Sequence, residues 1–231
     1  MKSAVASIQE LMAHPAPGLV FGPHERAKLP RRAHPTRHTL SSPIGERERG
    51  ELDRLIAGAP ELADLAELYA WSNGVDLFAL PGVGGEEQAW ALSLLPVRLW
   101  AGATALWMPG GECESFMEEC ELYHNGTWRV FATFPSEDMN LVQFFSGEYE
   151  GRALAGRIFC VGLDGYLGFE EEVAPNLSAL MDEVRRDPAA FFDRLGFGWE
   201  IGLYGDPIEA YVADVRDHPD AMPGPSAEVP G

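Results

Sequence analysis

The fold is decided by one stretch, Glu61-Leu-Ala-Asp-Leu-Ala-Glu-Leu-Tyr-Ala-Trp-Ser-Asn-Gly-Val-Asp-Leu-Phe78, which predicts a helix, an abrupt stop and a strand. Apolar residues in its first part recur at the spacing of one helix face, namely Leu62, Leu65, Ala66 and Tyr69, with Leu68 and Trp71 widening the stripe. Asn73-Gly74 then offers a residue that turns left-handed and ends the helix. We interpret the fold-defining residues as core and helix stop: Tyr69, Trp71, Asn73 and Gly74.

The segments around this stretch alternate between helical and strand-like patterns. Strands are predicted over 75–80, 88–95, 128–134, 140–145 and 157–163, and Asp164-Gly165 predicts a tight turn after the last of them. Helices are predicted over 1–12, 44–58, 97–107, 112–123, 175–186 and 188–195. Aromatic-rich strands joined by short loops favour an α+β fold, with a mostly antiparallel sheet of about five to six strands between N-terminal and C-terminal helices.

The chain divides into an arm, one domain and a tail. Residues 13–43 are rich in proline and carry four histidines, a composition that excludes a long helix or a central strand. We expect residues 1–43 to form a partly ordered Pro/His-rich arm and residues 44–215 to form a single domain. The proline-rich residues 216–231 are expected to be disordered.

Charge is distributed unevenly along the 231 residues, whose net charge is −19. Residues 1–54 hold nine Lys/Arg and six Asp/Glu, whereas the rest holds eight arginines and 30 acids. An acidic body repels nucleic acid and anionic membranes and attracts basic proteins. The same charge is also typical of plain solubility or of a salt-tolerant host. No apolar run is long enough to span a membrane and no secretory signal is evident, so we expect a cytoplasmic protein.

Residues with catalytic or metal-binding chemistry do not form a recognisable set. Cys113, Cys120 and Cys160 contain no Cys-x-x-Cys pair, so we expect reduced thiols and no metal. His34 and His38 are separated by a proline and fit a linker better than a metal site, and His124 fits a solvated turn. Gly-x-Ser-x-Gly does not occur. The sequence therefore predicts no enzyme, no metal and no cofactor.

The ordered series of motifs resembles the SUKH superfamily, the Smi/Knr-type domain. The residues that carry the resemblance are Leu65-x-x-Leu-Tyr-x-x-Ser-Asn-Gly74, the strand Trp90–Pro96, Val130-Phe-Ala132, Arg157–Asp164 and Val173-Ala-Pro-x-Leu-x-x-Leu-Met181. The resemblance extends over residues 44–196. The resemblance implies a protein-binding module without catalytic residues. Many members are immunity proteins that neutralise bacterial toxins, often nucleases, and fungal relatives are adaptors in cell-wall signalling.

We expect from this resemblance an immunity protein that neutralises a cognate, basic toxin by masking its surface. The alternatives are a regulatory adaptor of the Smi/Knr type and a carboxylate-dependent hydrolase, which would require a deep cleft with two close carboxylates. The candidate partner-binding residues form an acidic surface with an aromatic anchor: Glu112, Glu114, Glu118, Glu119, Glu121 and Tyr123, with a second patch of Glu170, Glu171 and Glu172.

Overall fold

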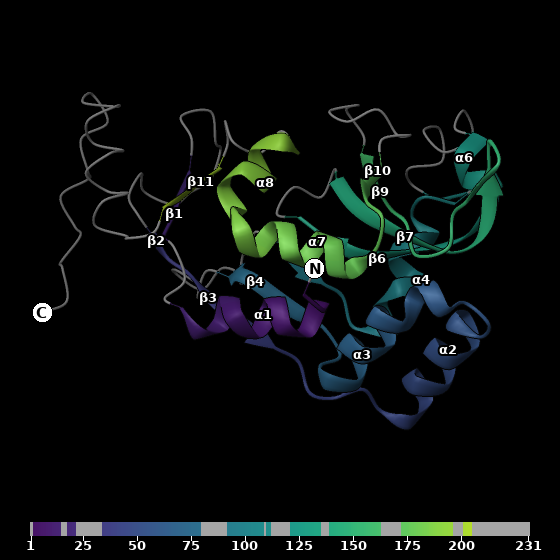
Figure 1. Cartoon of the computed structure of the whole chain (residues 1–231), viewed down its shortest axis with the longest axis horizontal. Helices are drawn as coiled ribbons and strands as arrows, with labels where there is room; N and C mark the ends of the chain where they lie inside the picture. Colours follow the sequence, from purple (N-terminus) through teal and green to yellow (C-terminus); the bar gives the residue numbers. More distant parts are fainter. Residues whose placement is uncertain are drawn as a thin grey trace, which may run out of the picture.

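The computed structural model describes residues 2–14, 18–21, 34–79, 92–108, 110–111, 121–134, 139–162, 172–195 and 201–204. It has an α+β fold in which helices pack on a large antiparallel sheet (Figure 1). The predicted fold class is therefore confirmed. The predicted turn at Asp164-Gly165 and the tail after residue 215 lie outside the described residues.

The main sheet is an antiparallel meander whose strands lie in the order β10-β9-β7-β6-β5-β4-β3, with β8 pairing the end of β7. The strands are β3 (Arg37–Leu40), β4 (Val75–Ala79), β5 (Leu92–Leu94), β6 (Gly126–Thr133), β7 (Met139–Tyr149), β8 (Arg152–Ala153), β9 (Ile158–Gly162) and β10 (Glu172–Ala174). Along the main path the strands follow one another in sequence apart from β8, and helices lie in two of the connections, α2 and α3 between β3 and β4, and α4 and α6 between β5 and β6.

The described residues form eight strands in this sheet, which is more than the sequence predicted. The additional strands are short or lie at an edge. The hairpin between β7 and β8 turns at Glu150 and Gly151, which have φ angles of +51° and +75°. Two consecutive positive φ angles are typical of a two-residue hairpin turn, although this pair is Glu-Gly rather than Asn-Gly.

The helices are α1 (Ala4–Ala13), α2 (Glu46–Ile56), α3 (Ala63–Trp71), α4 (Val97–Ala105), α6 (Glu121–His124), α7 (Leu177–Arg186) and α8 (Pro188–Arg194), and a 3-10 turn, η1 (Pro60–Leu62), precedes α3. Asp187 caps the start of α8, because its carboxylate accepts a hydrogen bond from the Ala190 N–H. Gly45 immediately precedes α2, and its N–H donates to the Glu48 carboxylate.

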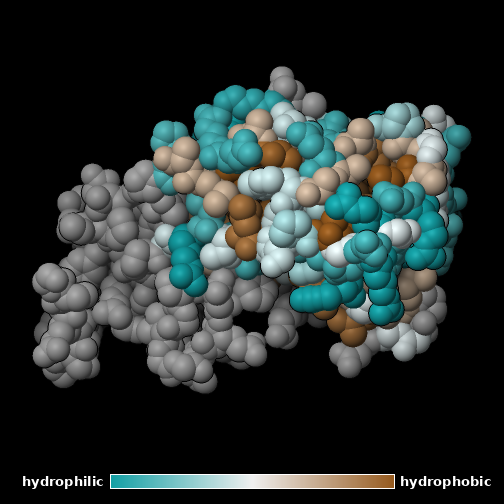
Figure 2. Space-filling view, turned by 90° about the horizontal axis from the view of Figure 1, so that it is seen from below, coloured by the Kyte–Doolittle hydropathy of each residue, from teal (hydrophilic) through white to brown (hydrophobic). Residues whose placement is uncertain are grey.

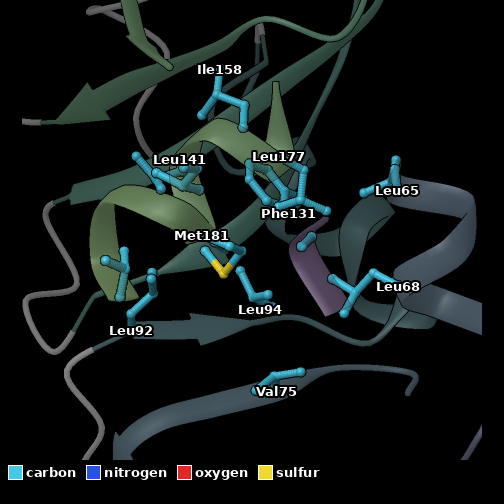
Figure 3. Close-up of a cluster of buried hydrophobic side chains, with 14 of the residues drawn as sticks. Leu65, Leu68, Val75, Leu92, Leu94, Phe131, Leu141, Ile158, Leu177 and Met181 are labelled. Atoms are coloured by element: carbon cyan, nitrogen blue, oxygen red, sulfur yellow. The ribbon is translucent and has the colours of Figure 1, made fainter. Parts of the chain in front are cut away.

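The principal core lies between the sheet and the helices α1, α3, α7 and α8. Figure 3 shows Leu177 and Met181 of α7 among the sheet residues Leu94 and Leu141. Helix α7 places an apolar residue on this face at every turn, since Leu177, Leu180, Met181 and Val184 are all buried.

A second apolar cluster covers part of the opposite face of the sheet. Val130, Val142, Phe144 and Phe159 come from the sheet, and α6 and the end of α4 lie over them. The sheet is therefore buried on both faces at its β6–β9 end, which explains why its strands there are apolar at nearly every position.

Two parts of the predicted arm belong to the domain. Helix α1 packs against α7, and its Ala4 N–H donates to Ser178 Oγ over 3.2 Å. Strand β3 pairs with β4 and forms an edge of the main sheet. The strands β1 (Gly18–Phe21) and β2 (His34–Pro35) form a separate three-stranded sheet with β11 (Ile201–Tyr204), at the left of Figure 1. The prediction that residues 13–43 hold no central strand is wrong, because β1 lies between β11 and β2. No proline interrupts β1, and Pro35 lies in β2 at the edge of this sheet.

The helix–stop–strand unit forms as predicted. Tyr69 is fully buried and Trp71 packs against the core. Gly74 has a φ of +122°, so the chain turns there into β4. A Cβ atom at this position would lie only 2.9 Å from the Leu94 carbonyl oxygen. Glycine is therefore required both by the backbone angle and by the approach of a neighbouring strand.

Candidate functional site

Helix α4 begins at a junction of three segments. The Asn73 side-chain oxygen accepts a hydrogen bond from the Val97 N–H over 3.1 Å, and the Glu48 carboxylate accepts one from the Arg98 N–H over 3.3 Å. Asn73 also donates to Glu48 over 2.9 Å. Two side chains from α2 and the α3–β4 turn thus bind the free N–H groups at the start of α4. Asn73 was predicted only as a helix stop, and the structure gives it this second role.

Hydrogen bonds also shift the acidity of Glu48. Burial on its own would raise the pKa of Glu48, but the hydrogen bonds from Asn73, Gly45 and Arg98 outweigh it and lower the pKa below its ordinary value. The carboxylate therefore stays ionised at neutral pH and holds α2 against the start of α4.

The inner face of α4 is fixed by three side chains, Trp100, Thr104 and Trp107. Trp100 is fully buried, packs edge-on against Tyr69 at 5.0 Å between ring centroids, and donates from Nε1 to the Leu95 carbonyl. Thr104 Oγ1 accepts a hydrogen bond from the Val130 N–H of β6 over 2.9 Å. These contacts determine which side of the helix faces solvent.

The exposed side of α4 and of the turn that follows it is largely apolar. Leu99, Leu106 and Met108 are 45–46% exposed, and they are three of the five large hydrophobic residues exposed in the described part of the chain. Between them lie small exposed residues, and we call the whole set the α4 surface: Leu99, Ala101, Gly102, Ala105, Leu106 and Met108. A helix that is apolar on both sides is normally buried, so this surface is typical of a protein-interaction site.

An open hollow of about 360 Å³ lies beside the α4 surface. Ala101, Ala105 and Met108 line one part of it, and Arg129 of β6 is the one charged side chain among its described lining residues. Arg129 donates from Nη1 to the carbonyl of Trp128 over 2.7 Å. The hollow is shallow and contains no carboxylate pair among these residues, so it does not have the geometry of a hydrolase cleft.

The described surface near α2 is hydrophilic, in contrast to the apolar α4 surface. Figure 2 shows the molecule from below, with strongly hydrophilic side chains gathered on the side where α2 lies. Helix α2 carries charges of both signs, in the sequence Glu-Arg-Glu-Arg-Gly-Glu-Leu-Asp-Arg. This mixed charge gives α2 a solvated face, whereas α4 has one charged residue, Arg98.

The structure describes three of the predicted partner-binding residues, Glu121 and Tyr123 of the first patch and Glu172 of the second. Glu121 is exposed at the start of α6. Tyr123 is 5% exposed and its hydroxyl donates to the Cys160 carbonyl over 3.0 Å, so its prediction as an exposed anchor is wrong. Glu172 lies within 3.1 Å of Arg152 and also pairs with Arg157, so its charge is largely neutralised. The remaining predicted acids lie outside the described residues: Glu112, Glu114, Glu118, Glu119, Glu170 and Glu171.

Burial shifts the pKa values of Cys160 and His38 in the described part of the chain. Burial raises the pKa of the Cys160 thiol to about 12, which leaves it protonated and unreactive at neutral pH. His38, predicted to be a linker histidine, instead packs edge-on against Phe78 and accepts a hydrogen bond from the Phe78 N–H through Nδ1. Burial lowers the pKa of His38. Within the described ranges, no group of three or more His, Cys, Asp or Glu side chains is placed to hold a metal ion.

Among the helices that the structure describes, none has the length and apolar character needed to cross a bilayer. Comparisons of the chain with protein-family models, with curated proteins and with solved structures find no match.

Proposed function

We propose that this chain is a non-catalytic protein-binding module, an immunity protein that binds a basic bacterial toxin and covers its surface. The observation that carries the proposal is the α4 surface, an exposed apolar surface formed by α4 and the turn after it on an otherwise highly charged protein. The resemblance to the SUKH superfamily supplies the class of partner. In this proposal α4 provides the docking face.

The net charge supports a basic partner. A charge of −19 attracts a positively charged protein and increases the association rate by roughly 10- to 1,000-fold at low salt. The α4 surface itself has no acidic side chain. In this proposal the acidic residues elsewhere on the protein attract the partner over long range, and the apolar α4 surface makes the direct contact. Salt weakens the electrostatic attraction but not the apolar contact.

Gly102 provides a substitution that blocks docking and leaves the fold intact. A Cβ atom at Gly102 meets no atom within 4 Å, so a longer side chain extends into solvent. Glutamine is also a better helix former than glycine by roughly 0.5–1 kcal/mol, so Gly102→Gln does not weaken α4. Gly50→Gln on α2 is the matched control, because Gly50 is also an exposed helix residue with no atom within 4 Å of its Cβ position.

The test uses the product of the neighbouring reading frame, purified as its C-terminal domain, and measures binding by surface plasmon resonance. We expect Gly102→Gln to weaken the Kd at least tenfold and Gly50→Gln to leave it unchanged. We expect higher salt to slow association. Reversing the charges of Glu114, Glu118 and Glu121 tests the acidic stretch in the same assay. If that triple variant loses binding while Gly102→Gln does not, α4 is not the interface. If the wild-type chain does not bind, the immunity proposal fails.

A further inference from the structure

The hollow beside α4 is continuous with the α4 surface. Ala101, Ala105 and Met108 belong to both, and Gly110 and Gly111 of the following turn also line the hollow. Gly111 lies tightly against the end of α4, because a Cβ atom there would be 2.4 Å from the Ala105 carbonyl oxygen. A group that enters the hollow therefore also contacts the apolar surface of the helix.

Arg129 provides the charge in the hollow, and its position is fixed by the fold. Trp128 and Val130 on either side of it are buried in the second apolar cluster, so Arg129 points away from that cluster. Its Nη1 donates to the Trp128 carbonyl over 2.7 Å. The bond from the Val130 N–H to Thr104 Oγ1 holds α4 against the same part of β6. The guanidinium is thus held beside the helix before a partner binds.

The chemistry of this arrangement selects a carboxylate. The bond to Trp128 uses one of the several N–H donors of the half-buried guanidinium. A guanidinium can bind a carboxylate through two parallel hydrogen bonds, and charge-assisted bonds are roughly twice as strong as neutral ones. Small apolar residues around the charge exclude water when they are covered, which strengthens such a pair. Arginine in a pocket of this kind is typical of the residues that dominate binding energy at protein interfaces.

The net charge of the chain indicates where this carboxylate comes from. A small free anion is repelled by a protein of net charge −19. An acidic side chain on a basic protein is brought to the hollow by the attraction between the two proteins. Leu106 and Met108, which are exposed next to the hollow, also require an apolar partner surface. A protein surface offers both groups together.

We propose that Arg129 is the specificity anchor of the α4 surface and pairs with an aspartate or glutamate of the partner, which is flanked by apolar side chains that rest on Leu106 and Met108. This inference rests on the proposed function, because it identifies a contact within the same interface. Long-range attraction favours any basic protein, whereas this pair rejects a basic protein that lacks an acidic residue at the matching position.

The test replaces Arg129 by glutamine and measures binding to the same C-terminal domain of the neighbouring gene product by surface plasmon resonance. Arg49→Gln on α2 is the matched control, because Arg49 is exposed and loses the same charge. Each substitution makes the chain more acidic, so general attraction alone would strengthen binding to a basic partner. We expect Arg129→Gln instead to weaken the Kd at least tenfold and Arg49→Gln to leave it within twofold. Arg129→Lys, which keeps the charge but not the paired geometry, should weaken it three- to tenfold.

A second set of measurements leaves this chain unchanged. Each acidic residue on the partner's surface is replaced in turn by its amide, and binding to the wild-type chain is measured. We expect one such substitution to weaken the Kd at least tenfold for the wild-type chain and less than twofold for Arg129→Gln, which is the signature of a direct pair. Thermal unfolding checks that Arg129→Gln is folded, and Arg129→Lys replaces it in this comparison if it is not.

The outcomes separate this inference from the proposed function. If the wild-type chain binds, Gly102→Gln loses binding and Arg129→Gln binds as tightly as the wild type, the α4 interface stands and the role of Arg129 is overturned. The absence of any partner acid coupled to Arg129 would overturn it as well. If the wild-type chain does not bind at all, the immunity proposal fails and this inference fails with it.

Discussion

Replacing Gly74 by alanine tests the link between the helix stop and the sheet. The backbone at Gly74 has a φ of +122°, and a non-glycine residue there costs about 1–3 kcal/mol in strain. The new Cβ would lie 2.9 Å from the Leu94 carbonyl oxygen and 3.1 Å from Pro96 Cδ, which is an overpacking cost of about 1–3 kcal/mol. Together these give a loss of about 2–6 kcal/mol in the free energy of unfolding.

This loss is measured by urea unfolding followed by circular dichroism, and by thermal unfolding. At about 2–4 °C per kcal/mol for a chain of this size, the midpoint is expected to fall by roughly 4–24 °C. Gly58→Ala is the control, because Gly58 has a φ of +79° but its Cβ position has no atom within 4 Å. It carries the strain without the collision. If Gly74→Ala is no more destabilising than Gly58→Ala, the contact with the β5–α4 segment contributes nothing and the reasoning is refuted.

Three further substitutions test other parts of the fold. Gly50→Ala in α2 is expected to raise the free energy of unfolding by about 0.5–1 kcal/mol, since the site is an exposed helix interior with free space, and chemical unfolding showing a decrease would contradict this. Asp64→Ala removes the carboxylate that accepts hydrogen bonds from the Ser178 N–H over 2.7 Å and the Leu65 N–H over 2.8 Å. We expect it to lower the free energy of unfolding by about 1–2 kcal/mol in the same measurement, whereas the control Asp193→Ala should lower it by less than about 0.5 kcal/mol. Burial lowers the pKa of His38, so as the pH drops below about 6.5 the unfolded chain binds a proton at this histidine more readily than the folded chain does, and the free energy of unfolding falls. We expect His38→Asn to reduce the difference in unfolding midpoint between pH 7.5 and pH 5.5. An unchanged difference would exclude this role for His38.

The local pattern of the sequence was sufficient for most helices and strands. The apolar residues that recur at helical spacing in 61–71 and 177–186 are largely buried on one side of α3 and α7. These features depend on neighbours along the chain. Strand β3 was missed because its pairing with β4 joins residues about 40 positions apart, and its proline-rich surroundings favoured an arm.

Candidate surface residues were harder to predict, because exposure depends on contacts between distant segments. The acidic residues around Tyr123 favoured an exposed aromatic ring, yet its hydroxyl reaches a carbonyl 37 positions away. Glu172 was read as part of an acidic run, but Arg152 and Arg157 neutralise it. In α4, Leu99 and Trp100 are both large and apolar, and the contacts of Trp100 with Tyr69 and Leu95 and of Thr104 with β6 decide which of them faces solvent.

The contact between α1 and α7 has a consequence for biosynthesis. Ala4 and Ser178 are separated by 174 positions, and at about 5–20 residues per second a ribosome needs roughly 10–35 s to make the second after the first. During that interval β3 to β10 are made in the order in which they pair, while Val5 and Ile8 of α1 have no finished core to enter. The first helix to be synthesised is thus among the last to dock, and its apolar face is available to chaperones until α7 has been synthesised.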